Sequence, residues 1–219
     1  MKILAADTAL GACSVAVLDG ARVLAHRFEA MERGHAEALA PMVEDAMRSS
    51  SVTFADLDRL AVTTGPGTFT GQRVGLAFMR GLRVALKRPL IGVTTLEAMC
   101  AAAQDETRLE FAAAVHDARR GEAYLAVASR DGLLIAPEIL LLDDVARRIA
   151  EAIPPGAAVA ICGTAAETVA TKLKQARVTS IRQPDALWVA RLALSALEPS
   201  GAPHPLYLRA PDAKLPASA

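Results

Sequence analysis

The chain opens with short apolar runs whose spacing and turn signals predict a three-stranded antiparallel meander. Residues 3–6 and 13–18 are apolar and rich in small or β-branched side chains, and residues 22–28 continue beyond an Asp19-Gly20 pair. Asp-Gly between two apolar runs is a strong signal for a two-residue hairpin turn. We therefore expect strands at these three ranges, joined by tight connections.

The same pattern returns in the second half of the chain. Both copies contain, in one order, an Asp, a Gly, an Ala-Val pair and an Asp-Gly turn between apolar runs. The members are Asp7, Gly11, Ala16-Val17 and Asp19-Gly20 in the first copy, and Asp117, Gly121, Ala126-Val127 and Asp131-Gly132 in the second. Single matches arise easily, because Ala and Val are common here, but the ordered set indicates a duplicated structural unit.

Helical and strand patterns alternate after each meander. Helices are predicted at residues 34–50, 70–87, 96–103, 142–152, 165–174 and 184–197, and strands at 57–63, 90–93 and 157–162. The first helix range carries apolar residues three and four positions apart, which is typical of a helix with one buried side. Pro41 should kink or divide this helix. Thr94 and Glu97 have the spacing of a capping box at the start of the third.

The order of elements is a meander, a helix, a strand, a helix and a strand, and it occurs twice. This order predicts an α/β protein with two stacked ribonuclease-H-like lobes, the second one degenerate. This is the architecture of the actin, heat-shock-protein and sugar-kinase (ASKHA) superfamily. We expect an amino-terminal lobe at residues 1–105, a carboxy-terminal lobe at 106–198 and a Pro-rich extended tail at 199–219. Residues 205–208 are the apolar part of that tail.

The charge balance argues against a protein that grips nucleic acid alone. Lys plus Arg and Asp plus Glu each number 24, so the net charge is zero, whereas such proteins usually show a basic surplus. The apolar run before Asp7 is too short for a signal peptide, and no later run has transmembrane length. We therefore expect a cytoplasmic protein that binds nucleic acid weakly without a partner.

The residue types that bind metals do not cluster. The three cysteines, Cys13, Cys100 and Cys162, are widely separated and lack the spacing of a metal knuckle. His35 would need a second His four residues on to match a metalloprotease helix, and that position is Leu. We expect buried thiols, no metal site, and a structural role for His35 at the start of its helix.

A Gly-rich loop joins a strand to a helix at residues 63–71, and its amides could hold an anion at the helix amino end. It lacks the Lys of a Walker loop, and a rigid turn with a capping Thr is the alternative. One aspartate ends the first strand of each lobe, Asp7 in the first and Asp117 in the second. The ASKHA superfamily holds the magnesium and phosphates of ATP at these positions, but no glycine loop follows either aspartate here. We expect no catalytic residue and at most a vestigial nucleotide or anion site, at Asp7, Gly65, Gly67, Thr68 and Asp117.

The helix predicted at residues 70–87 has glycines in its interior. Glycine in a helix costs roughly 1 kcal/mol against alanine, so close approach of another backbone is the natural reason for its use. The first two predicted helices both carry apolar or small residues on more than one side. The expected partner interface is Leu39, Val43, Met47, Gly71, Val74, Gly75, Phe78 and Leu82, with a place in the core as the alternative for each.

The run Gly-Pro-Gly-Thr-Phe-Thr-Gly-Gln-Arg-Val-Gly-Leu-Ala at residues 65–77 is a specific motif. It resembles the Gly-Pro-Gly-Ser-Phe-Thr-Gly-Leu-Arg-Ile-Gly-Leu-Ala signature of the TsaB family, formerly YeaZ, of tRNA threonylcarbamoyladenosine biosynthesis. Gln72 in place of Leu is a minor departure. The resemblance extends, in order along nearly the whole chain, over residues 3–14, 35–41, 65–81, 92–98, 117–124 and 205–209.

The resemblance implies an inactive paralogue of TsaD, the subunit that transfers threonylcarbamoyl to the adenosine 3′ of certain anticodons. Such a protein is expected to be a non-catalytic scaffold or activator that binds TsaD through helices of its amino-terminal lobe, with the ATPase TsaE joining the complex. Alone, it is expected to form a homodimer through the same surface, and to meet tRNA only within the complex. No cofactor and no membrane contact are expected, and a nucleotide at the interface with a partner stays open.

Two other classes remain open from the residues alone, an ATP-dependent small-molecule kinase of the same fold and a metallopeptidase. Nucleotide titration with a turnover assay would separate the first, and metal analysis of the purified protein the second. The missing glycine loops after Asp7 and Asp117, together with the unpaired His35, argue against both.

Overall fold

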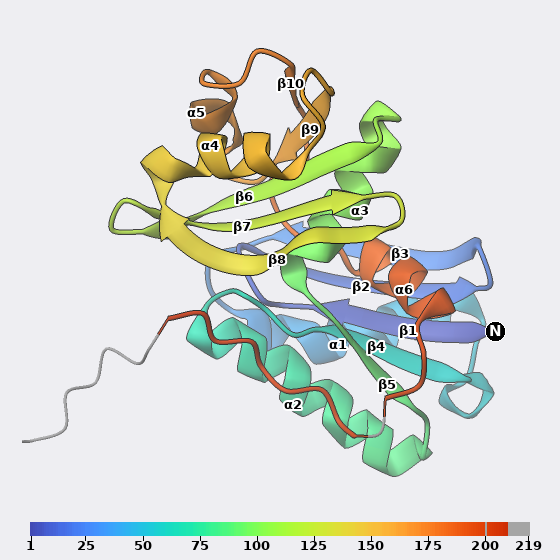
Figure 1. Cartoon of the computed structure of the whole chain (residues 1–219). Helices are drawn as coiled ribbons and strands as arrows, with labels where there is room; N and C mark the ends of the chain where they lie inside the picture. Colours follow the sequence, from blue (N-terminus) through green and yellow to red (C-terminus); the bar gives the residue numbers. More distant parts are fainter. Residues whose placement is uncertain (200, 210–219) are drawn as a thin grey trace, which may run out of the picture.

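Two five-stranded sheets with the same strand order form the framework of the protein (Figure 1). The computed structural model describes residues 1–199 and 201–209. The first sheet has the order β3-β2-β1-β4-β5, and the second, read from its meander edge, has β8-β7-β6-β9-β10. In each sheet the meander strands pair antiparallel and the two later strands pair parallel. The two sheets confirm the predicted fold class.

The strands lie close to their predicted ranges. Those of the first sheet are β1 (Lys2–Asp7), β2 (Ala12–Asp19), β3 (Arg22–Ala30), β4 (Arg59–Thr63) and β5 (Leu90–Val93). Those of the second are β6 (Phe111–Arg119), β7 (Glu122–Ser129), β8 (Gly132–Leu141), β9 (Val159–Cys162) and β10 (Ala176–Val178). The three-residue strand β10 was not predicted, since so short a run carries no alternating pattern.

The helices also begin and end near their predicted limits. They are α1 (His35–Ser50), α2 (Phe69–Leu86), α3 (Thr95–Thr107), α4 (Leu142–Ala152), α5 (Ala166–Ala170) and α6 (Ala186–Ser195), with a short 3₁₀ turn, η1 (Phe54–Asp56). Pro41 lies on the exposed side of α1 and does not divide the helix, whereas a kink at this residue stays a prediction. Helix α5 is shorter than predicted, since residues 172 and 173 continue in tighter, three-residue hydrogen-bonded turns.

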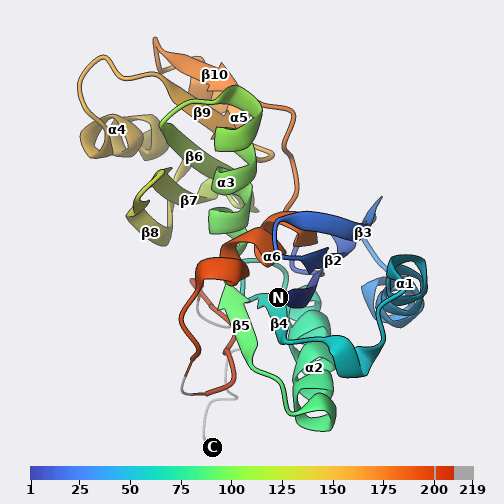
Figure 2. The ribbon, with the colours of Figure 1, turned by 90° about the vertical axis from the view of Figure 1, so that its right-hand side faces the viewer.

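Strand alternation divides each sheet between two layers of helices. In β1, Leu4 and Ala6 face α1 and α2, whereas Ile3 and Ala5 face α6. In the second sheet, alternate residues of β6 face α4 and α5 on one side and α3 on the other. Helices α3 and α6 therefore form a middle layer between the sheets (Figure 2). The middle layer is lined mainly by alanines, which let helices and sheets approach closely.

The middle layer exchanges helices between the two halves of the chain. Helix α3 follows β5 in sequence but packs on the second sheet, while α6 follows β10 but packs on the first. The guanidinium of the buried Arg59 donates hydrogen bonds to the carbonyl oxygens of Ala193 and Ala196, and so ties the end of α6 to β4. A cation at a helix carboxyl end is also electrostatically favourable. The division into lobes near residue 105 stays a prediction.

The predicted capping box starts α3. The Thr94 side chain accepts from the Glu97 amide, and the Glu97 carboxylate accepts from the Thr94 amide at 3.0 Å.

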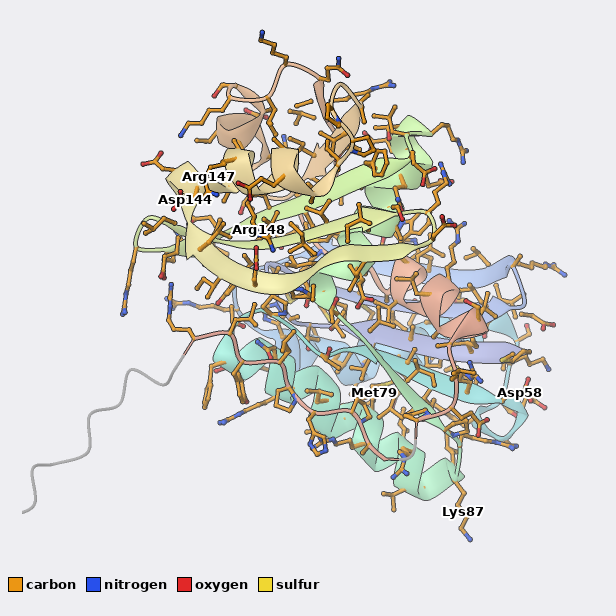
Figure 3. All side chains as sticks on the ribbon, viewed as in Figure 1. Asp58, Met79, Lys87, Asp144, Arg147 and Arg148 are labelled. Atoms are coloured by element: carbon orange, nitrogen blue, oxygen red, sulfur yellow. The ribbon has the colours of Figure 1, made fainter. Side chains whose placement is uncertain are left out.

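On the outer side of the second sheet, exposed ion pairs join Arg147 of α4 to Asp144 and Glu151 (Figure 3). None of the helices within the described ranges is both long enough and apolar enough to cross a bilayer. Residues 200 and 210–219 of the predicted tail lie outside the described residues.

Two glycines of α2 predict opposite effects of the same substitution. A Cβ at Gly71 would lie 2.2 Å from the carbonyl oxygen of Thr8, whereas a Cβ at Gly81 would meet no atom of residues 1–199 or 201–209 within 4 Å. Gly71→Ala should therefore lower the free energy of unfolding by roughly 2 kcal/mol or more, because backbone must move. Gly81→Ala should raise it by up to about 1 kcal/mol through helix propensity. Urea unfolding monitored by circular dichroism measures both, and destabilisation by Gly81→Ala would contradict the assignment.

Candidate functional site

A cleft of about 870 Å³ opens between the two sheets' loops, at the carboxyl ends of β1, β4, β6 and β9. This is the position at which α/β proteins commonly bind ligands. Its walls include Gly67 and Thr68 from the first half, and Asp117 and Thr164 from the second. Three of the five residues predicted for a vestigial site thus meet at one cleft, and the other two, Asp7 and Gly65, do not line it.

Asp7 is sealed behind the cleft. Its side chain is 0% exposed, and its Oδ1 accepts hydrogen bonds from the Thr63 hydroxyl at 2.6 Å and the Ala9 amide at 3.2 Å. Its Oδ2 has no partner among the described residues. Burial raises the pKa of this carboxyl to about 7, against the opposing effect of the Thr63 and Ala9 hydrogen bonds. Asp7 is therefore placed to support the loop rather than to contact a ligand.

The Gly-rich loop is filled by the chain itself. The Thr68 amide donates to the Ala9 carbonyl at 2.8 Å, and the Thr68 hydroxyl accepts from the Gly71 amide as an N-cap. A Cβ at Gly67 would lie 2.3 Å from the Ala9 oxygen. The glycines are thus required for close contact with the turn after β1, which is the rigid-turn alternative. Anion binding by this loop stays a prediction. The Thr68 amide is not free for it, because that amide donates to Ala9.

Gln72 also holds this loop. Its side chain is 2% exposed, and its Nε2 donates to the Gly67 carbonyl at 2.9 Å. The departure from Leu at this position is therefore a specific contact and not a minor change. Its Oε1 is buried without a partner among the described residues, so the contact carries a cost.

Asp117 closes a turn in the second half. Its Oδ1 accepts from the Arg119 amide at 2.8 Å, and its own amide donates to the Thr164 hydroxyl at 2.9 Å. Its side chain is half exposed to the cleft. The neighbouring His116 is buried, and burial lowers its pKa to about 4, so the ring is neutral near pH 7. With Glu32 also on the wall, this cleft has no surplus of cations to hold a phosphate.

Metal-ligating side chains are dispersed. Residues 1–199 and 201–209 contain no group of three or more His, Cys, Asp or Glu that could hold a metal ion. The three cysteines are buried and unpaired. The Nε2 of His35 lies 2.9 Å from the Leu10 carbonyl, so this side chain links the start of α1 to the turn after β1.

The predicted partner residues separate into core and surface. Leu39, Val43 and Met47 of α1 are at most 4% exposed and belong to the core between α1, α2 and the first sheet. They face inward because the apolar stripe of α1 covers the sheet. Their assignment to the partner interface was therefore wrong. Gly71 and Gly75 are likewise buried against Thr8.

Helix α2 keeps an apolar outer face. Val74, Phe78 and Leu82 are half-buried at the edge of the core, and the residues beyond them turn outward. We define the outer α2 face as Ala77, Gly81, Val84 and Ala85, all exposed, with Val84 at 72%. None of these four residues is in the set predicted for the interface, although their spacing on one side of α2 was a signal for it.

An aromatic and cationic stack continues this surface at the start of α2. The Arg73 guanidinium carbon lies 3.4 Å from the centre of the Phe69 ring, and Phe69 stacks on Tyr207 with centroids 5.8 Å apart. Phe69 is 56% exposed and Tyr207 45%. This group was not predicted, because Tyr207 is far in sequence from Phe69 and Arg73.

Comparisons with known proteins agree on one family. The family described as "TsaD: tRNA N6-adenosine threonylcarbamoyltransferase" matches residues 23–180. The tRNA threonylcarbamoyladenosine biosynthesis protein TsaB of Escherichia coli is 42% identical over 131 residues, which are 60% of this chain and 56% of that protein. The corresponding Haemophilus influenzae protein is matched over 55% of its length, so the chain spans about half the length of these curated relatives.

Solved structures give the same result over nearly the whole chain. YeaZ from Pseudomonas aeruginosa superposes with a TM-score of 0.77 at 31% identity, covering 94% of this chain and 99% of that one. A second Pseudomonas aeruginosa structure, described as an uncharacterized protein with similarity to peptidase YeaZ, gives a TM-score of 0.79 at 31% identity, covering 95% and 99%.

Asp7 predicts a distinct pH dependence of stability. Its folded pKa of about 7 lies above its ordinary value of 3.8, so only the folded protein takes up this proton as the pH falls from about 7 to 4. The contribution of Asp7 to stability is therefore present at low pH and lost as the pH rises through 7, by an amount on the order of 4 kcal/mol. Asp7→Asn should be more stable than the parent protein at pH 8.

Urea unfolding of both proteins from pH 8 to pH 5 checks this. The difference between them should shrink steadily as the pH falls, and other titrating groups such as His116 cancel in it. A difference that does not change with pH would contradict the buried state of Asp7.

Proposed function

We propose that this chain, which belongs to the TsaB (YeaZ) family, is a non-catalytic subunit in the biosynthesis of threonylcarbamoyladenosine in tRNA. It acts as a scaffold or activator by binding a TsaD-type transferase through the outer α2 face, with TsaE joining the complex. The observation that carries this proposal is Gly81, an exposed glycine within a helix whose missing Cβ is not explained by any contact among the described residues.

The state of the loops around the cleft supports a non-catalytic role. Transfer of a phosphoryl or carbamoyl group needs donors aimed at the charge that develops on the reacting atoms. Here the Thr68 amide and hydroxyl are engaged by Ala9 and Gly71, and Asp7 is buried away from the cleft. The groups that such chemistry would need are used to hold the chain together.

The outer α2 face has the features of a helix-on-helix docking surface. Ala77, Gly81 and Ala85 are small, so a partner helix can approach the α2 backbone closely, and Val84 offers an exposed apolar side chain next to them. Every charged residue of α2 is an arginine, at positions 73, 80 and 83, and Lys87 follows at its end, where Figure 3 shows it reaching outward. A partner helix with apolar and acidic residues fits this face.

The same features support self-association when the partner is absent. Helix α1 lies beside α2 and exposes Glu37 and Glu44, while α2 presents Arg83 and Lys87. In a two-fold dimer each patch meets its counterpart reciprocally, so an acidic helix of one copy can face the basic helix of the other. A homodimer and a complex with a TsaD-type partner would then compete for one surface.

tRNA is proposed to reach the chain only through the complex. The net charge is zero, and unaided tRNA binding depends on a cationic surface. No metal or cofactor is needed for the proposed role. A metallopeptidase, suggested by the word "peptidase" in the description of one similar structure, would need a metal site, and the described residues offer no candidate cluster. A kinase of the same fold would need the loop amides that the turn after β1 engages.

Val84→Arg is the substitution that tests the docking surface. Val84 is 72% exposed, so the folded chain should tolerate the change, with the free energy of unfolding within about 0.5 kcal/mol of the parent value. A charge buried in the interface without a partner should weaken both self-association and binding of the TsaD-type partner at least thirtyfold, or about 2 kcal/mol. Sedimentation equilibrium and co-purification with the partner measure the two affinities.

Leu134→Arg is the matched control. Leu134 is an exposed apolar side chain, at 44%, on β8 of the second sheet, away from α2. This variant should keep both affinities. The surface is wrongly assigned if Val84→Arg unfolds like the parent protein and still binds the partner with unchanged affinity.

A further inference from the structure

Residues 203–209 run along α2 (Figure 1). We call residues 203–209 the strap. Arg80 donates to the Pro203 carbonyl through its Nε at 3.1 Å, and the Arg73 Nε donates to the Tyr207 hydroxyl at 2.9 Å. Two arginines two turns apart on one side of α2 thus hold the strap at Pro203 and at Tyr207. Tyr207 also completes the stack with Phe69.

The strap also pairs with the loops at the end of the first sheet. The Leu206 amide donates to the Thr64 carbonyl at 2.7 Å, just after β4. Pro203 covers Gly92 of β5 so closely that a Cβ at Gly92 would lie 2.6 Å from the Pro203 Cβ. The sequence of β5 is therefore adapted to the strap, which indicates that the strap is a built part of the fold.

At its far end the strap reaches the second sheet. Arg209 forms an ion pair with Glu122, the first residue of β7, and both side chains are largely shielded from solvent, at 28% and 33% exposure. Tyr124, two residues further along β7, lines the cleft. The strap thus joins three places: α2, the loop after β4 and the strand that forms one wall of the cleft.

We propose that the strap is a latch between the two halves of the protein, through which docking on the outer α2 face and the opening of the cleft are coupled. A partner that packs along α2 meets Arg73, Phe69 and Tyr207 as well as Val84. Any change that it makes in the strap is carried to Glu122, and coupling of this kind acts equally in both directions. The coupling between docking and the cleft rests on the function proposed above, whereas the latch itself does not.

The latch is tested on the isolated chain by the distance between its two halves. Spin labels at Arg33→Cys, before α1, and Thr168→Cys, in α5, sit on exposed positions of the two halves, and the buried native cysteines stay unlabelled. Electron–electron double resonance should give one narrow distance distribution. Arg209→Glu should broaden it and shift it to longer distances, since two carboxylates then face each other.

Restoring the pair with opposite signs separates the latch from general damage. Glu122→Arg combined with Arg209→Glu should return the narrow distribution, although either single change broadens it. Equal distributions in the parent protein and in Arg209→Glu would overturn the latch. A broad distribution that persists in the double variant would also overturn it, because the specific pair would not be the cause.

The coupling is tested by adding the TsaD-type partner to the same labelled proteins. The partner should shift the distance distribution of the parent protein, and Arg209→Glu should bind it while losing that shift. The same shift in both proteins would overturn the coupling. Absence of binding to the parent protein would instead contradict the proposed function, while the measurements on the isolated chain would still decide the latch.

Discussion

The close contact between the start of α2 and the turn after β1 determines much of this structure. Glycines at positions 67, 71 and 75 let the helix meet Thr8 and Ala9 with no side chain between them, and the Thr8 hydroxyl donates to the Gly71 carbonyl at 2.7 Å. Interiors packed to this density tolerate few changes. The contact fixes the rotation of α2 about its axis, and it therefore decides which side of the helix faces solvent.

The same contact underlies both parts of the proposed function, docking on α2 and the absence of catalysis. In a nucleotide-binding protein, a glycine loop leaves space above its amides for phosphates. Here the chain fills that space, and Thr68, which could have faced an anion, caps α2. With its inner side committed, α2 presents Ala77, Gly81, Val84 and Ala85 outward as a continuous strip. Under the proposed function, the filled loop and the exposed strip of α2 follow from a single packing arrangement.

Local features could be predicted from the sequence, whereas long-range contacts could not. Asp-Gly turns and apolar runs predict the meanders, because these signals act over a few residues, and the ordered recurrence of the same local signals predicts two lobes. The exchange of α3 and α6 between the sheets leaves no trace in their periodicity, since a helix stripe does not say which sheet it covers. For the same reason the stripe of Leu39, Val43 and Met47 could be expected at a surface although it lies in the core. The strap looks like a free tail in the sequence because its partners are more than 80 residues away.

Whether the chain is a non-catalytic activator is decided most directly by tRNA modification with the TsaD-type partner and TsaE, measured with and without it. We expect threonylcarbamoyladenosine to form rapidly only when the chain is present. We also expect Asp117→Asn, which alters the acidic wall of the cleft but not α2, to stimulate as well as the parent protein. Modification that proceeds equally without the chain would contradict an activating role. An Asp117→Asn protein that binds the partner normally and fails to stimulate would contradict a non-catalytic one, since the cleft would then do chemistry.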